Sequence, residues 1–480
     1  MKIDFEAVMG FQNVSINRNI LLPFVSVYGK YFIFVESFFD FISMDKNKLF
    51  GILNDWNYWD KPVPEFFPRP LYQEKINQYL TTGEVIVLKG IRRAGKSTLL
   101  INHIRYLTEN GIDKKAFLFV NFEDPRLGDE PDSELLEQIL ETYKEFVNHE
   151  VKPHVFLDEV QNVHQWEKWV LTGYELDRGH FYVTGSSSKL LSREFGTALS
   201  GRFLAINVLP LGFDEYLLFK NLPAPDKNKL ITQKILYKKA FNDYLTAGGF
   251  PKAVSLVDDL RRQEMIMYYE TIILKDIVAR YNLKNFDSVK KVALFLLSNI
   301  GKPFNLNKVK TTLQLSYDLA DKYFEYLKDT FLLFEIYKYD HSLNKQFANR
   351  RKVHCIDNGI LSAISFRVSE DYGRYLENIV FVELMRREKD IYFHQGQKEC
   401  DFVIKESLRI TQVIQVCRSL KDEKTRQREI DGLLEAIKTY NLNDGLILTE
   451  DEDFETEADG FKINVQPVWK WFLQPDIRTV

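Results

Sequence analysis

The sequence EVIVLKGIRRAGKSTLL, from Glu84 to Leu100, joins an apolar run typical of a buried strand to an amphipathic helix through a loop with two glycines. The loop fits the spacing G-x-x-x-x-G-K-[ST], and it comprises Gly90, Ile91, Arg92, Arg93, Ala94, Gly95, Lys96 and Ser97, with Thr98 directly after it. Glycines let backbone N–H groups turn inward around a phosphate, and the positive end of the helix dipole adds attraction. We therefore predict that these residues bind ATP, with Lys96 at the β- and γ-phosphates and the Ser97 hydroxyl on Mg²⁺.

A second motif, VFLDEVQ from Val155 to Gln161, ends an apolar run with two adjacent acids. The motif predicts that Asp158 lies at the carboxyl end of a strand beside the phosphate loop and holds Mg²⁺ there. Glu159 would then polarise the attacking water. Taken alone, such a pattern also fits a strand that simply meets solvent, but the loop upstream favours the catalytic interpretation.

Two further polar sites follow along the chain. In VTGSSS, Thr184 or Ser186 is placed to sense the γ-phosphate, although the serines could equally cap the next helix. In LSGRF, Arg202 is a candidate arginine finger, acting in cis or from a neighbouring subunit. An ordinary exposed ion pair is the competing interpretation of Arg202.

The pattern of apolar runs divides the chain into four parts. Continuous apolar runs alternate with helical patterns from residue 61 to 210, which predicts an α/β domain with a parallel sheet buried on both faces. Helical periodicity dominates residues 211–365, and strands and helices alternate again over residues 366–480. Residues 1–60 form an N-terminal extension, and a proline-rich linker that ends at Pro70 follows it.

Composition restricts the compartment and the partners. The chain has 64 basic and 68 acidic residues, so any contact with nucleic acid would need a local basic patch. Its three cysteines form no CxxC pair, which favours a reducing, cytoplasmic setting over disulfides or zinc. An apolar segment at residues 20–42 contains Lys30, Glu36 and Asp40, and these charges argue against a membrane span. A natural start at Met44, with the first 43 residues not native, is our preferred interpretation of that segment.

Beyond these features, the chain resembles a family of prokaryotic AAA+-class ATPases whose nucleotide domain precedes a domain of unknown function. The resemblance runs from Pro68 to about Tyr440 and is carried by GIRRAGKSTLL, FLDEVQNVHQWEKWV, TGSSSKLLSREFGTALSGR, LPLGFDEYL, YLTAGGFPKAV and YLENIVFVELMRR. It implies a P-loop NTPase core with a strand-borne catalytic glutamate, a helical and winged-helix middle, and a nuclease-like C-terminal fold. It also makes a homo-oligomer plausible, and it implies no reaction beyond ATP hydrolysis.

Residues 307–339 predict two helices across a short turn at Leu315-Ser316, followed by strands, which is the layout of a winged helix. The candidate recognition helix, from Tyr317 to Asp329, carries four acids and two lysines, which disfavours contact with phosphates. A basic patch from Asn344 to Lys352 fits DNA better. Contact with DNA and packing against protein both remain open.

The last part carries the frame of a PD-(D/E)xK nuclease, with Glu377 on a helix and Asp401 on a strand. Such an enzyme needs acids to hold Mg²⁺ and a lysine beside them. The acid-x-Lys positions read Gln415-Val416-Cys417, so we expect a degenerate site with lost or weakened cleavage.

The sequence thus predicts a Mg²⁺-dependent ATPase that drives or gates interaction with a nucleic-acid or protein partner. Two alternatives remain: a nucleotide-gated DNA- or protein-binding scaffold with little turnover, and an ATP-licensed DNA nuclease.

Overall fold

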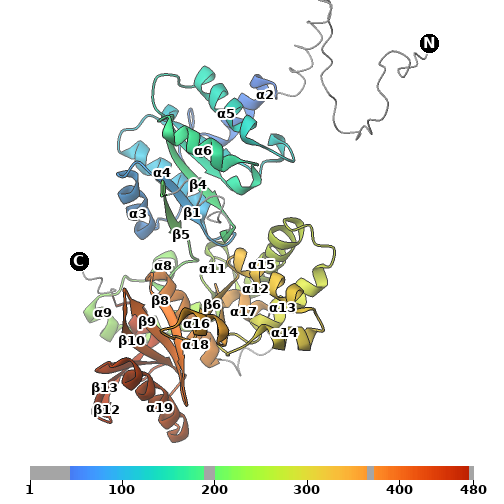
Figure 1. Cartoon of the computed structure of the whole chain (residues 1–480). Helices are drawn as coiled ribbons and strands as arrows, with labels where there is room; N and C mark the ends of the chain where they lie inside the picture. The colour runs from blue at the N-terminus through green and yellow to red at the C-terminus, as the bar shows by residue number, and fades with distance from the viewer. Residues whose placement is uncertain (1–43, 189–200, 365–371, 475–480) are drawn as a thin grey trace, which may run out of the picture.

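The computed structural model describes residues 44–188, 201–364 and 372–474. The apolar segment at residues 20–42 and the origin of the first 43 residues lie outside the described residues, so these two expectations stay predictions. Within the described part, the two larger sheets and the helices packed on them form two lobes, and a mainly helical middle with a two-stranded sheet joins them (Figure 1).

The N-terminal lobe is built on a five-stranded parallel sheet of order β2-β3-β4-β1-β5. Its strands are β1 (Val85–Lys89), β2 (Phe117–Asn121), β3 (His154–Asp158), β4 (His180–Gly185) and β5 (Phe203–Asn207). The middle strands are buried on both faces, as their continuous apolar runs predict. Parallel pairing brings the carboxyl ends of all five strands to one edge of the sheet.

Helices cover both faces of this sheet. One face packs against α3 (Pro70–Leu80) and α4 (Lys96–Glu109), and the other against α2 (Lys46–Trp56), α5 (Ser133–Phe146) and α6 (Trp166–Glu175). Short 3-10 turns lie at η2 (Lys114–Ala116), η3 (Pro125–Leu127) and η4 (Val160–Asn162). Leu49 and Leu53 of α2 are fully buried, so this part of the predicted N-terminal extension contributes to the core of the lobe.

The middle of the chain is helical. Its elements are α8 (Phe213–Phe219), α9 (Lys227–Thr232), α10 (Lys234–Ala247), α11 (Pro251–Val254), α12 (Asp258–Thr271), the π-helix η6 (Ile272–Ala279), α13 (Phe286–Leu297), α14 (Leu306–Leu313), α15 (Tyr317–Asp329), β6 (Leu333–Tyr337), α16 (Leu343–Ala348), β7 (Arg351–Cys355) and α17 (Asn358–Ile364). The two helices, the short turn and the antiparallel β6–β7 pair occur in the predicted order.

The C-terminal lobe holds a six-stranded mixed sheet of order β12-β13-β11-β10-β9-β8. The strands are β8 (Asp390–Gln395), β9 (Glu399–Glu406), β10 (Arg409–Val416), β11 (Asp444–Thr449), β12 (Phe454–Ala458) and β13 (Phe461–Pro467). Helix α19 (Glu423–Tyr440) packs on one face, whereas α18 (Tyr372–Arg386) and α20 (Val468–Phe472) pack on the other. The predicted α/β class with a second sheet near the C-terminus is therefore confirmed.

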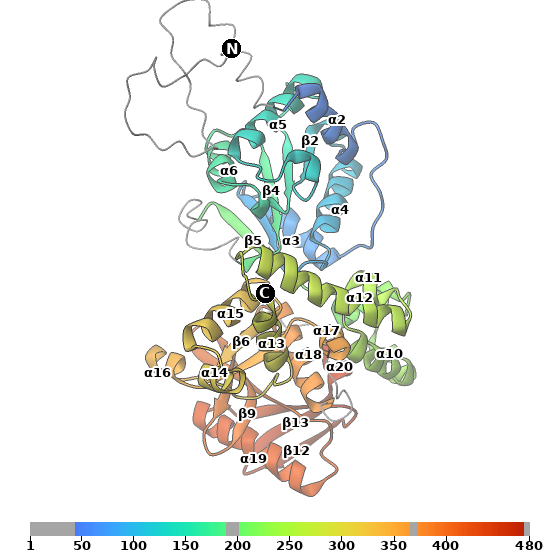
Figure 2. The same cartoon turned by 90° about the vertical axis from the view of Figure 1, so that its right-hand side faces the viewer.

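The lobes share one apolar core rather than resting on a thin linker. One buried cluster runs from Ile86 of β1 through Phe213 and Tyr244 to Phe472 of α20. Figure 2 shows α12 crossing between the upper and lower lobes, close to the end of the five-stranded sheet. The edge of that sheet is thus covered by the helical middle, and this arrangement shapes the site.

Candidate functional site

The loop after β1 turns tightly because two glycines occupy its ends. Gly95 has a φ of 98° at the start of α4, and a Cβ atom at Gly90 would lie 2.2 Å from the carbonyl oxygen of Val208. Only glycine fits at position 90 without a shift of the backbone, and position 95 favours glycine because its backbone is left-handed. Ile91 and Ala94 of the loop are fully buried, and they belong to the apolar core beneath it.

Lys96 and Glu159 lie together behind this loop. The Lys96 ammonium donates hydrogen bonds to the carbonyls of Gly90 and Ile91, at 3.0 and 3.2 Å, and lies 3.5 Å from Oε1 of Glu159. Burial would raise the pKa of Glu159, but the charges of Lys96 and Arg92 outweigh it and hold that pKa below its usual value. Glu159 is therefore ionised at neutral pH, as a group that orients water must be.

Asp158 is held by hydroxyl groups from two other elements. Its Oδ1 accepts hydrogen bonds from Ser97, at 3.0 Å, and from Thr184, at 2.6 Å. The Thr184 hydroxyl in turn accepts the backbone N–H of Glu159 at 2.9 Å. Burial and the neighbouring charge of Glu159 raise the pKa of Asp158 to about 6. A divalent cation between Ser97 and Asp158 would offset that unfavourable charge, so this donor pair fits the predicted Mg²⁺.

A pocket of about 390 Å³ opens over these groups. Its lining combines the predicted Arg92, Arg93, Ala94, Gly95, Lys96, Ser97, Thr98, Asp158 and Glu159 with residues that the sequence analysis missed, namely Phe67, Arg69, Asn121, Glu123, Leu211, Pro251, Lys252 and Tyr268. Arg69 is fully enclosed, binds both oxygens of Glu215 at 2.7 Å, and donates to the carbonyl of Ala94 at 3.1 Å. The sequence gives only a weak signal for Arg69, because it is one of two cations, with Lys61, in the proline-rich segment that leads into the lobe.

Ser186 lies near the groups of this pocket, whereas Arg202 lies away from them. Ser186 is fully buried, and its hydroxyl lies 3.5 Å from Nε2 of Gln161, whose amide donates to Glu159 at 2.6 Å. Arg202 precedes β5 and pairs with Glu175 at 3.0 Å, at the sheet edge opposite the phosphate loop. A five-residue strand spans roughly 16 Å, so Arg202 cannot serve this pocket in cis. A role across a subunit interface stays a prediction.

A second group of charges lies in the C-terminal lobe, where Lys352 of β7 inserts among three acids. Its ammonium lies 3.0 Å from Glu377, 2.7 Å from Glu399 and 3.0 Å from Asp401. The Lys352 side chain is fully buried, so the prediction that it belongs to an exposed basic patch from Asn344 was wrong. Burial, with the neighbouring charge of Asp401, raises the pKa of Glu377 even though Lys352 opposes the shift.

The remaining predicted residues of that group are also in place. Asp401 accepts the backbone N–H of Val416 at 3.0 Å, and Gln415 bridges the backbone N–H of Asp401 and the carboxylate of Glu429. Cys417 is buried beside them as an ordinary thiol. Among the described residues, no group of three or more His, Cys, Asp or Glu side chains is arranged to hold a metal ion. A metal at Glu377, Asp401 and Gln415 therefore stays a prediction.

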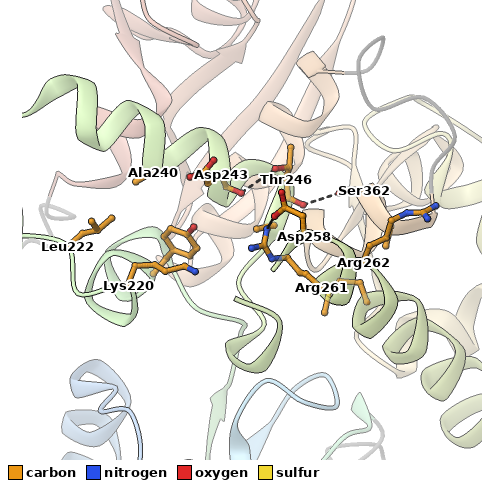
Figure 3. Close-up of a pocket in the computed structure, with 14 residues that line it drawn as sticks. Lys220, Leu222, Ala240, Asp243, Thr246, Asp258, Arg261, Arg262 and Ser362 are labelled. Atoms are coloured by element: carbon orange, nitrogen blue, oxygen red, sulfur yellow. Dashed lines mark hydrogen bonds and ion pairs between the residues drawn. The ribbon is translucent and has the colours of Figure 1, made fainter. Parts of the chain in front are cut away.

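Another cleft lies between α8, α10, α12 and α17, with a volume of about 600 Å³ (Figure 3). Arg261 there pairs with Asp258 at 3.0 Å and donates to the carbonyl of Leu256 at 2.8 Å. The Ser362 hydroxyl donates to the carbonyl of Thr246 at 2.9 Å. These contacts engage Arg261 and Ser362 with neighbouring groups of the chain itself.

A glycine loop on a parallel sheet, with a buried lysine, a serine–aspartate pair and an adjacent glutamate, defines a P-loop NTPase domain. The family model of an AAA domain matches residues 82–217, and a model of a domain of unknown function, DUF8612, matches residues 238–371. The chain is 32% identical over 416 residues to an uncharacterized protein of Methanocaldococcus jannaschii, covering 82% of this chain and 89% of that one. It belongs to this family of AAA-domain proteins, which confirms the predicted resemblance.

The chain is also similar to other proteins. An uncharacterized protein of Haemophilus influenzae is 30% identical over 412 residues, which cover 85% of this chain and 98% of that protein. Among solved structures, the Walker-type ATPase of Pyrococcus abyssi is similar at 15% identity, with 62% of this chain and 96% of that one covered and a TM-score of 0.41. The Orc1 protein of Aeropyrum pernix, solved in complex with DNA, is 12% identical, with 68% and 98% covered and a TM-score of 0.32.

No helix within the described ranges combines the length and apolarity needed to cross a membrane.

Proposed function

We propose that the chain binds ATP with Mg²⁺ at the loop of residues 90–97 and hydrolyses it. One observation carries this proposal: Lys96, Asp158 and Glu159 meet Ser97 in a single buried pocket beneath the glycine loop. Lys96 would neutralise the β- and γ-phosphates, Ser97 and Asp158 would hold the metal, and Glu159 would orient water for attack. The bound metal would supply charge neutralisation on the transferring phosphoryl group.

Replacement of Lys96 tests this assignment. Because Lys96 supplies a buried positive charge, Lys96→Ala is expected to lower phosphate release by about 10²-fold or more. Lys168→Ala on the exposed side of α6 removes the same charge elsewhere and should leave turnover unchanged. Equal turnover in both variants, measured on a chromatographically clean preparation, would refute the site.

The same pocket is compatible with a scaffold that holds ATP and hydrolyses it slowly. Single-turnover decay of bound ATP separates the two functions, since a scaffold retains its nucleotide even when a candidate partner is added.

For the partner, exposed lysines on α14 (Lys308 and Lys310) and the exposed Lys345 and Arg350 support nucleic acid, whereas the acids on α15 oppose it. The ATPase rate with and without single- and double-stranded DNA distinguishes a nucleic-acid partner from a protein partner.

A second candidate function, DNA cleavage in the C-terminal lobe, is favoured by Lys352. The sequence-based case against cleavage was the missing lysine, and β7 brings one to within 3.0 Å of Glu377 and Asp401. Glu377 and Asp401 would supply ligands to a divalent metal and Lys352 the positive charge beside it.

Incubation of linear and branched DNA with Mg²⁺ or Mn²⁺ tests cleavage. Asp401→Asn and Lys352→Gln should each abolish cutting while ATP turnover continues. Equal cutting by these variants and the unmodified chain would identify a contaminant and remove this function.

A further inference from the structure

The Arg92 side chain ties the phosphate loop to the helical middle. The Arg92 guanidinium binds both carboxylate oxygens of Asp276, at 3.1 Å and 2.9 Å. Asp276 belongs to the π-helix η6 and is only 2% exposed. Two parallel hydrogen bonds of this kind fix both the direction and the distance of a contact, so the Arg92–Asp276 pair holds the phosphate loop in one arrangement against the helical middle. π-helical segments are rare and are frequently found at functional sites.

The same guanidinium also binds Glu123, at 2.5 Å, on the loop after β2. One positive charge thus lies between two carboxylates, and both Arg92 and Glu123 line the phosphate pocket. Three of the five N–H groups of Arg92 donate to these acids, so a phosphate oxygen that approaches the guanidinium competes with two carboxylates for its charge. A triphosphate would also repel both acids.

Neighbouring contacts join the same surfaces. Arg93 lies over the ring of Tyr268 on α12, with its guanidinium carbon 5.9 Å from the ring centre. Farther along, the Ser188 hydroxyl donates to Asp329 at the end of α15, and the Tyr281 hydroxyl donates to the other oxygen of the same carboxylate. Tyr268 and Asp276 therefore contact the phosphate loop directly, whereas Tyr281 is linked to Ser188 through Asp329. Figure 2 shows α12 beneath the sheet edge.

We propose that ATP and Asp276 compete for Arg92, so that nucleotide binding releases η6 from the phosphate loop. This inference rests on the proposed function of the same pocket and concerns its regulation. When nucleotide occupies the pocket, the Arg92–Asp276 pair breaks, and the helical middle loses this contact with the phosphate loop. The opposite arrangement, in which Asp276 merely positions Arg92 for phosphate, predicts an effect of opposite sign on affinity.

Binding of a nonhydrolysable ATP analogue with Mg²⁺ to the full chain, measured by calorimetry, tests the competition. Asp276→Asn keeps the side-chain shape but frees the guanidinium, so affinity should rise about fivefold. Glu270→Gln is the matched control, because this exposed acid lies on α12 and pairs with Lys290 at 3.7 Å, away from the loop. The control should bind the analogue as the unmodified chain does. Unchanged or weaker binding by Asp276→Asn would overturn the inference.

Hydrogen exchange over residues 272–281 gives a second measurement. The analogue should speed exchange there in the unmodified chain, whereas Asp276→Asn should exchange fast already and respond no further. If Asp276→Asn fails to fold, Glu123→Gln replaces it, since that side chain is 40% exposed and its loss should raise affinity in the same direction. Failure of the unmodified chain to bind the analogue would refute the proposed function, whereas normal binding with exchange unchanged by the analogue would refute only the release of η6.

Discussion

At the scale of single residues, the phosphate site works by placing opposite charges in a buried volume. Glu159 has a left-handed backbone, with a φ of 54°, and this conformation turns its side chain out of the strand direction towards Lys96. Gln161 and the backbone contact through Thr184 hold it in that position. A carboxylate fixed beside a lysine and kept ionised is suited to orienting water rather than to binding phosphate.

Glu159→Gln therefore should separate binding from turnover. The amide keeps the size of the side chain but is a poor acceptor for the proton of water, so phosphate release should fall about 10²-fold or more while analogue binding persists. Glu145→Gln on the exposed face of α5 serves as the control. Turnover of Glu159→Gln close to that of the unmodified chain would contradict the assigned role.

At the scale of elements, α4 packs on the sheet through buried histidines. His103 of α4 and His154 of β3 are almost fully enclosed, and both lie beside the ring of Tyr182. Burial, with the charge of His154, lowers the pKa of His103 to about 3, and burial with its cationic neighbours lowers that of His154 to about 4. The folded chain thus keeps both rings neutral at a pH where the unfolded chain protonates them.

Stability of this lobe should consequently fall with acid. Above pH 6.5, the usual pKa of histidine in the unfolded chain, neither the folded nor the unfolded state protonates these rings. Below that pH only the unfolded chain takes up the protons, so the free energy of unfolding falls by about 1.4 kcal/mol for each pH unit and each histidine. Between pH 6.5 and 5, His103 alone should remove about 2 kcal/mol from the free energy of unfolding. Urea unfolding at several pH values should show a shallower slope for His103→Gln, whereas His341→Gln, at an exposed site, should keep the full slope.

At the scale of the whole molecule, the C-terminal helix α20 ties the second sheet to the helical middle. Phe472 lies with its ring centre 6.4 Å from that of Phe213 and 5.6 Å from that of Phe241, and it is 7% exposed. Arg387 of the loop after α18 lies over Trp471, 4.2 Å from its ring centre. These contacts make the last helix part of the core that also reaches the nucleotide lobe, so motion of one lobe is mechanically linked to the other.

Phe472→Ala should weaken the packing of α20 against the helical middle. Loss of a buried aromatic ring costs about 3–5 kcal/mol, and the cavity would open between α8, α10 and α20. We expect a lower unfolding temperature and faster proteolysis around residues 213–241. Phe454→Ala, at a side chain 39% exposed on β12, should change neither quantity.

Local sequence predicted the fold of the nucleotide lobe. The parallel sheet was confirmed, and the glycine loop and the acids after β3 lie together at its carboxyl edge, because backbone freedom at glycine and continuous apolar runs act over short windows. The roles of the loop residues stay predictions until nucleotide is measured. Arg202 illustrates the limit, since its motif suggested a finger while its place at the far edge of the sheet rules out action in cis.

Long-range pairings were beyond the reach of the sequence. Lys352 meets Asp401 across 49 residues, and Arg92 meets Asp276 across 184. No short-range pattern indicates these partners for Lys352 or Arg92, because which acid each side chain meets depends on how β7 and η6 pack against distant elements. The chain's local chemistry thus specifies a nucleotide pocket and two sheets, whereas the charges that link the lobes and complete the C-terminal cluster follow only from burial in one shared core.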